Sequence, residues 1–281
     1  MTGHPTAAIC RTLGIARGTA YHVARERPKG FYRKATDETV LRQIRSVTNS
    51  RATYGYRRVW AMVNQQCGTR YNRKRIRRVM RMNGMMLAPR VHRRHGRPHL
   101  GRIAQPVSNQ RYCTDIFHIP CWSGEVVSVA IALDCHDREV ISFVTSLATF
   151  KGADIRTLMD RCLWRRFGEE TLKTPHPIQW LSDNGPQYTA TATVLYAQDL
   201  GFEPITTPAY SPQSNGMSEA FVKTFKRDYV SGADLRDAES VLTQLPNWME
   251  DYNAVAPHSA LGMRSPLEYR KELQSSSQSV Q

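Results

Sequence analysis

The chain has 281 residues, 41% of them hydrophobic, and a formal net charge of +15. This composition suits one large or two smaller domains with buried cores. No run of about 18 apolar residues could span a bilayer, and residues 1–30 lack the apolar segment of a signal peptide. We therefore exclude an integral membrane protein and expect a cytoplasmic protein without a membrane partner.

The charge is distributed unevenly. Residues 1–104 contain 24 Lys and Arg against 3 Asp and Glu, whereas the rest contains 15 against 21. Such a basic segment predicts a polyanion binder, because phosphate contacts release condensed counterions. An anionic membrane is the alternative ligand. It is disfavoured because the sequence lacks a long amphipathic stretch with bulky aromatics and contains two helix-turn-helix patterns. We expect double-stranded DNA as the partner.

Residues 1–36 contain the first of these patterns, in the stretch AAICRTLGIARGTAYHVARER. Gly14 separates two short helical segments, which is the layout of a helix-turn-helix. A plain helix pair packed on a neighbour is an equal alternative. The expected apolar positions are Ile9, Leu13, Ile15, Tyr21 and Val23.

Residues 37–86 predict a basic helical DNA-binding domain. One helix is marked by Val59, Met62 and Val63, and Gly68 provides a turn. Asn72 is positioned to cap a second helix that ends at Gly84. Its expected apolar face is formed by Ile76, Val79 and Met80. No acidic residue occurs on its other faces, which predicts phosphate contact by Arg73, Lys74, Arg75, Arg77, Arg78 and Arg81.

Residues 87–108 contain three prolines and many basic residues, which predicts a basic linker. His92, His95 and His99 are disfavoured as metal ligands because the neighbouring arginines repel cations. The six cysteines form neither a C-x-x-C pair nor a metal-finger spacing. Zinc is therefore not indicated, and we expect reduced, mostly buried thiols.

Residues 109–230 predict an α/β domain. Three strands in close succession are expected in RYCTDIFHI, EVVSVAIALD and REVISFVTSL, followed by a helix in ADIRTLMDRCLWRRFG. A strand in PIQWLSDNG, a helix in TATVLYAQDLG and a strand in FEPITT follow. The order ends with residues 209–229, which begin as a polar loop and turn into a helix. The order βββαβαβα predicts a mixed sheet with helices packed on it.

Three carboxylates stand out in this domain. Asp115 lies inside the first strand, where burying an ionised carboxylate is costly without a partner or metal. Asp183 ends the fourth strand in SDNG, which is also ordinary turn chemistry. Glu219 lies on the last helix, where a lone glutamate is usually solvated. If the first and fourth strands pair and this helix crosses their ends, the three converge.

Residues 231–273 are expected to form a helical extension of the domain. Ser265, Pro266 and Glu268 match a capping box with proline at the first helical position. His258 is expected to pack or cap rather than bind metal. The polar residues 274–281 predict a disordered tail.

Several motifs of the sequence resemble those of a known family. Thirty-five residues separate Asp183 from Glu219, and Lys226 follows seven residues later. With TD on the first strand, SDNG and SPQSNGMSE, this resembles the DDE core of retroviral integrases and bacterial transposases. YGYRRVW, NRKRIRRVMRMNG, ALDCHDRE, FVKTFKRDY and PHSALGMRSPLEY extend the resemblance over residues 37–270. The extended resemblance is to the OrfB transposases of insertion sequences with two overlapping reading frames.

The resemblance implies an RNase H-like catalytic core, preceded here by helix-turn-helix units instead of the zinc module of retroviral integrases. It implies that Asp115, Asp183 and Glu219 are the catalytic acids. Such oxygen ligands suit Mg²⁺ or Mn²⁺, with two ions in the site. The residues expected to contact DNA near this site are Lys226, Lys223, Asn215 and Gln213. Ser211, Ser214 and Ser218 are interpreted as loop, cap and packing residues.

The implied function is that of a transposase that binds insertion-sequence ends, cleaves DNA strands and joins them to target DNA. A homo-oligomer on DNA is expected, associated with the nucleoid, and an upstream-frame partner or fusion is possible on this reading. The alternatives are an inactive or regulatory DNA-binding protein, and an RNase H-like nuclease without strand transfer. An intact carboxylate triad followed by Lys226 favours the transposase.

Overall fold

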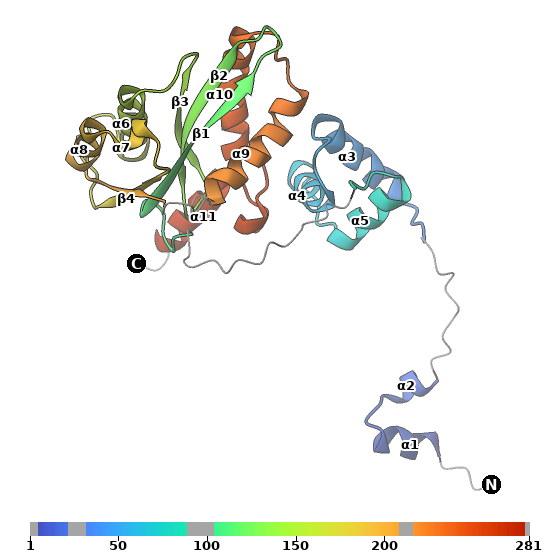
Figure 1. The fold of residues 1–281 in the computed structure, drawn as a ribbon. Coiled ribbons are helices and arrows are strands. Elements are labelled where there is room, and N and C mark those ends of the chain that lie inside the picture. The colour runs from blue at the N-terminus through green and yellow to red at the C-terminus, as the bar shows by residue number, and fades with distance from the viewer. Residues whose placement is uncertain (1–4, 22–31, 89–103, 208–215, 279–281) are drawn as a thin grey trace. The chain divides into compact units, whose positions relative to one another are not determined.

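The computed structural model describes residues 5–21, 32–88, 104–207 and 216–278 (Figure 1). The chain divides into two compact units, residues 1–39 and 40–281. Among the described residues, no helix is both long and apolar enough to cross a membrane.

The first unit contains two short helices, α1 (Thr6–Thr12) and α2 (Arg17–Ala20). Gly14 lies between them with φ of 61°, a left-handed conformation that glycine adopts readily. Of the apolar positions named from the sequence, Ile9, Leu13, Ile15 and Tyr21 are exposed, whereas the neighbouring Cys10 is buried. Helices of seven and four residues offer too little surface to enclose a core. Val23 lies outside the described residues.

A three-helix domain follows, built from α3 (Asp37–Ser50), α4 (Tyr56–Gln66) and α5 (Arg73–Met82). The Asn72 side chain accepts a 2.8 Å hydrogen bond from the Lys74 backbone N–H, so the predicted cap is confirmed. Gly84 follows α5 with φ of 66°. The predicted apolar faces are also confirmed, because the buried side chains of this domain include Val59, Met62, Val63, Ile76, Val79 and Met80.

The α/β domain contains a mixed sheet in the order β3-β2-β1-β4-β5 within the described residues. The first three strands pair antiparallel, and β1 pairs parallel with β4, which in turn pairs parallel with β5. The predicted meander is confirmed. The first and fourth strands are neighbours, which meets the condition for the three carboxylates to converge. The strands are β1 (Arg111–Pro120), β2 (Val126–Asp134), β3 (Val140–Ser146), β4 (Ile178–Ser182) and β5 (Phe202–Thr206).

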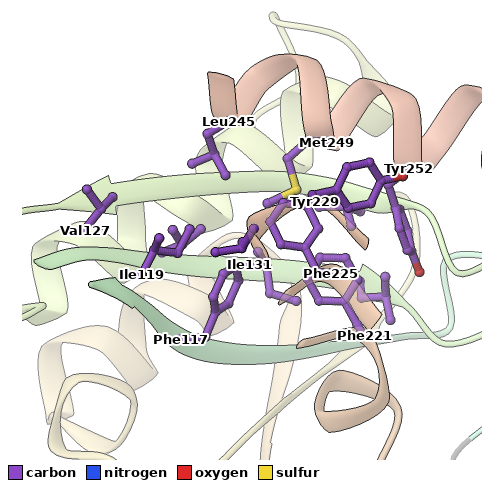
Figure 2. Packing of buried hydrophobic residues seen from close by; sticks show 14 of the residues in the cluster. Phe117, Ile119, Val127, Ile131, Phe221, Phe225, Tyr229, Leu245, Met249 and Tyr252 are labelled. Carbon is purple, nitrogen blue, oxygen red and sulfur yellow. The ribbon is translucent and has the colours of Figure 1, made fainter. Parts of the chain in front are cut away.

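Helices cover both faces of the sheet (Figure 1). One face packs against α6 (Gly152–Phe167), α7 (Pro186–Thr189) and α8 (Thr191–Asp199). The other face packs against α9 (Gly216–Asp228) and α10 (Ala238–Ala254). Figure 2 shows this second core, where Phe117 of β1 lies beside Phe221 and Phe225 of α9. The sheet is thus enclosed between two helical layers.

The C-terminal helix α11 spans Pro266–Gln278. Its predicted capping box is confirmed: the Ser265 N–H donates to the Glu268 carboxylate at 2.9 Å, and the Glu268 N–H donates to Ser265 Oγ at 3.3 Å. The prediction of a disordered tail from residue 274 is wrong as far as Gln278. Neither proline nor glycine occurs after Pro266 to end the helix.

A buried ionic cluster joins the turn after β2 to α6 and α11. The Arg166 guanidinium, fully shielded from solvent, lies 3.2–3.5 Å from the carboxylates of Asp134, Asp137 and Glu139. Arg270 of α11 also donates to Glu139, at 2.9 Å. All three carboxylates belong to the stretch ALDCHDRE, which therefore has a structural role.

The six cysteines, all within the described part of the chain, are free thiols. Cys67 is exposed, and the other five are buried. His258 stacks edge-on against Tyr252 with ring centroids 4.6 Å apart. Burial lowers the pKa of His258 to about 4. The predicted packing role of this histidine is therefore confirmed.

Candidate active site

Asp115 and Asp183 follow equivalent positions on two paired strands. Cys113 of β1 pairs with Leu181 of β4 in parallel register, and both side chains belong to the core beneath α9. Asp115 and Asp183 each follow two residues later along the chain. Because side chains alternate between faces of a strand, Asp115 lies on the same face as Cys113 and Phe117, the face that α9 covers. The two aspartates therefore follow neighbouring positions of the sheet, near the end of β4.

The Asp183 turn holds its carboxylate by local contacts. Asp183 Oδ1 accepts a 3.0 Å hydrogen bond from the Gly185 backbone N–H. A Cβ on Gly185 would meet the Gln187 side chain first and would stand 3.0 Å from that same oxygen, so glycine leaves room for both side chains at this turn. Asn184 ties this turn to the end of β5 through a 2.9 Å bond to the Thr207 carbonyl.

Glu219 occupies the first turn of α9, with its side chain 41% exposed. Lys223, one turn later, lies 3.7 Å from the Glu219 carboxylate and is itself 79% exposed. The ammonium of Lys226 lies 6.0 Å from the ring centroid of Phe117 on β1. Phe117 is on the same strand as Asp115, so this contact places Lys226 beside β1, and it was not predicted from the sequence.

Electrostatics connect Asp115 to the other groups. Burial raises the pKa of Asp115 to about 6, while the Ile116 N–H, which donates to its carboxylate at 2.9 Å, opposes the rise. The charges of Asp183 and Glu219 raise this pKa further, and that of Lys226 lowers it. A cation near Asp115 would relieve both the burial and the repulsion. The donor set therefore fits a hard divalent ion.

The carboxylates do not form a closed cage. Among the residues that the structure describes, no three His, Cys, Asp or Glu side chains are close enough to hold an ion together. Gln213 and Asn215, predicted to contact DNA, lie outside the described residues, as do Ser211 and Ser214. Ser218 is buried, in agreement with a packing role.

The basic residues of α5 differ in exposure. Arg73, Lys74, Arg77 and Arg81 are exposed, whereas Arg75 and Arg78 are partly buried. Arg77 lies over the Tyr56 ring at 5.6 Å, and Arg75 lies over the Tyr71 ring at 5.2 Å. Arg73, Arg77 and Arg81 recur every four residues, so they form one exposed stripe along the helix.

The sheet order and its two helical layers define an RNase H-like α/β core of the integrase and transposase class. A chain from the cryo-EM structure of a simian T-cell lymphotropic virus intasome with PP2A regulatory subunit B56 gamma aligns with a TM-score of 0.50. It is 14% identical, over 81% of this chain and 73% of that one, a similarity of fold.

Family models match most of this chain: an HTH-like domain over residues 35–95 and integrase core domains over residues 105–212 and 200–266. Transposase InsD for insertion element IS2A/D/F/H/I/K of Escherichia coli is 39% identical over 280 residues, 96% of this chain and 92% of the relative. Transposase InsD for IS2-9 of Escherichia coli (strain K12) shows the same identity over 90% of its length. The chain belongs to this family of insertion-element transposases with an integrase core.

The chain is accordingly a DNA transposase, a DDE-type polynucleotidyl transferase. The HTH-like domain and the family imply DNA binding, and the family implies use of a divalent metal ion.

Proposed function

We propose that Asp115, Asp183 and Glu219 are the catalytic acids and that they hold two Mg²⁺ or Mn²⁺ ions. The observation that carries this proposal is the parallel register of β1 and β4, beneath the helix that bears Glu219. Held by these residues, such ions would supply activation of the attacking oxygen and stabilisation of the leaving oxygen in an in-line displacement. Because substrate phosphate completes Mg²⁺ coordination, the open arrangement of the three carboxylates agrees with this role.

The lysines of α9 are proposed to position DNA. Lys226 is exposed beside the strand of Asp115, where it would contact the phosphate next to the cleaved bond. Lys223 is exposed one turn from Glu219 and would contact the same strand. Gln213 and Asn215 precede α9 in the chain, and we propose them as further DNA contacts.

We propose that α5 binds the phosphates of the element ends through Arg73, Lys74, Arg75, Arg77, Arg78 and Arg81. The exposed stripe supplies the outer contacts, whereas the partly buried Arg75 and Arg78 also stabilise the helical domain. The proposed domain boundaries are those inferred from the sequence, with the helical domain at residues 37–86 and the catalytic core at 109–230. The proposal also includes a homo-oligomer on DNA, an upstream-frame partner or fusion, and a cytoplasmic, nucleoid-associated location.

Replacing Arg73, Arg77 and Arg81 together by alanine should weaken DNA binding by the full chain. Each phosphate contact contributes about 0.9 to the slope of log affinity against log salt, so the slope should become shallower by about 2–3. Fluorescence anisotropy over a salt series measures this slope. The matched control is Arg45→Ala, an exposed arginine on α3. A triple variant with an unchanged slope would show that the stripe does not contact phosphate.

Labelled element ends incubated with the purified chain and Mg²⁺ should yield cleaved strands and strand-joined products. Chelation by EDTA should abolish both, and excess Mn²⁺ should restore them, because carboxylate oxygens accept either ion. Products are separated on a denaturing gel. Cleavage without joining would identify a nuclease, and end binding with neither reaction would identify a regulatory DNA-binding protein.

A further inference from the structure

Helix α9, which bears Glu219, ends in a buried ionic contact with the helical domain. Asp228 is the last residue of α9, and its side chain is 1% exposed. Its carboxylate accepts hydrogen bonds from Thr53 Oγ1 at 2.6 Å and from Arg58 Nη1 at 2.7 Å. Arg227 donates to it from the adjacent position at 2.6 Å. Thr53 precedes α4 and Arg58 lies within it, so this carboxylate joins two elements about 170 residues apart.

A second contact of the same kind lies beside the first. Asp251 of α10 accepts a 2.7 Å hydrogen bond from Arg51 and another of 2.7 Å from the Tyr229 hydroxyl. The buried Tyr54 ring lies 3.8 Å beneath the Arg58 guanidinium and 5.6 Å from that of Arg51. The loop before α4 is thus held at several points against the ends of α9 and α10.

Helix chemistry alone does not explain an aspartate at the position of Asp228. Carboxylates are disfavoured at helix C-termini, where the backbone carbonyls concentrate negative charge. Burial by itself would raise the pKa of Asp228, yet hydrogen bonds from Arg227 and Arg58 lower this pKa to about 2. The carboxylate therefore remains ionised, and its partner from the helical domain compensates for its burial.

We propose that Asp228 is a positioning residue that sets the distance between the DNA end held by the helical domain and the phosphodiester cleaved at the catalytic core. This inference rests on the proposed function. Glu219 and Asp228 are nine residues apart on α9, about 13 Å at 1.5 Å per residue. Lys226 lies two residues before Asp228. A tilt of α9 at Asp228 therefore displaces both groups relative to Asp115, which the sheet holds.

The test maps the cleaved phosphodiester at nucleotide resolution, using the full chain, labelled element ends and Mg²⁺. Asp228→Asn keeps the shape of the side chain but removes its charge. Cleavage should spread to neighbouring phosphodiesters, and the rate at the main position should fall by about 10- to 100-fold, as expected for a misplaced substrate. End binding by the helical domain should persist. Thr53→Val, a milder change, should shift the same pattern less.

Two controls separate positioning from general stability. Asp234→Asn removes an exposed carboxylate that pairs with Arg236 on the surface, and it should leave the cleavage pattern unchanged. Ile155→Val loosens the opposite core of the sheet, so it should lower thermal stability without moving the cleavage position. Together, these two variants show how the cleavage pattern responds to loss of a surface charge and to loss of stability alone.

The outcomes distinguish failure of the proposed transposase function from failure of the positioning role of Asp228. If the unmutated chain cleaves no element end, the proposed function fails. If the unmutated chain cleaves at one position and both Asp228→Asn and Thr53→Val retain that position and rate, the positioning role is overturned. If Asp228→Asn does not fold, Thr53→Val decides: a shifted pattern supports the role, and a pattern like that of Ile155→Val contradicts it.

Discussion

Replacing Glu219 by glutamine should lower strand cleavage and strand joining by about 10³-fold or more while leaving folding and end binding intact. Glutamine keeps the size and helix propensity of glutamate but removes the charge proposed to hold the metal. Groups that act as one catalytic unit typically lose most of the rate when one member is removed. The measurement is a single-turnover assay with labelled element ends and Mg²⁺, with circular dichroism to check the fold.

Glu239 provides a matched control, because it is an exposed glutamate in the first turn of α10. Glu239→Gln should keep full activity. Lys226→Ala should weaken DNA engagement near the site while leaving metal binding nearly intact, so it separates positioning from chemistry. A folded Glu219→Gln protein that joins strands at the unmutated rate would show that the active-site assignment is wrong.

Replacing Asp115 by asparagine should abolish activity and, in the metal-free protein, increase stability. The folded-state pKa of Asp115 is raised from 3.8 to about 6. A carboxyl with a raised folded-state pKa favours the fold when protonated, so its stabilising effect is lost as pH rises from about 4 to 6. At pH 7 the substitution should therefore raise the free energy of unfolding by about 1–3 kcal/mol. Urea unfolding at pH 4 and pH 7 measures the difference.

Asp183→Asn is the comparison for this prediction. Asp183 is exposed, so its loss should abolish activity with little change in the free energy of unfolding. Added Mn²⁺ should stabilise the unmutated protein, because an ion that binds only the folded chain raises stability, and should stabilise either variant less. An Asp115→Asn protein no more stable than Asp183→Asn at pH 7 would contradict the burial argument.

Local patterns predicted most of the α/β domain. The alternating stretch that contains Asp115, the apolar run of β2 and the periodic face of α6 were each visible in the sequence. The capping box at Ser265 was equally visible, because its hydrogen bonds join residues three apart. These features depend on neighbouring residues along the chain, which is why they could be predicted.

Predictions that depended on packing were less successful. The short helices around Gly14 leave their apolar residues exposed, since periodicity does not report whether a partner surface is present. Arg166 occupies the last turn of α6, where basic residues are ordinary, yet its guanidinium is buried among three carboxylates. The ionic contact of Asp228 was likewise not predictable from the sequence, because its partners Thr53 and Arg58 are remote along the chain.

The sequence by itself determined the kind of chemistry: a basic helical region, an α/β core and three carboxylates at a spacing that resembles the DDE pattern. Only the tertiary structure decided that β1 and β4 pair in parallel, with Asp115 and Asp183 following paired residues beneath the helix of Glu219. The physical reason is that residue type and spacing set local conformation and available charge. Strand pairing and the burial of charged partners depend on contacts between segments tens to hundreds of residues apart.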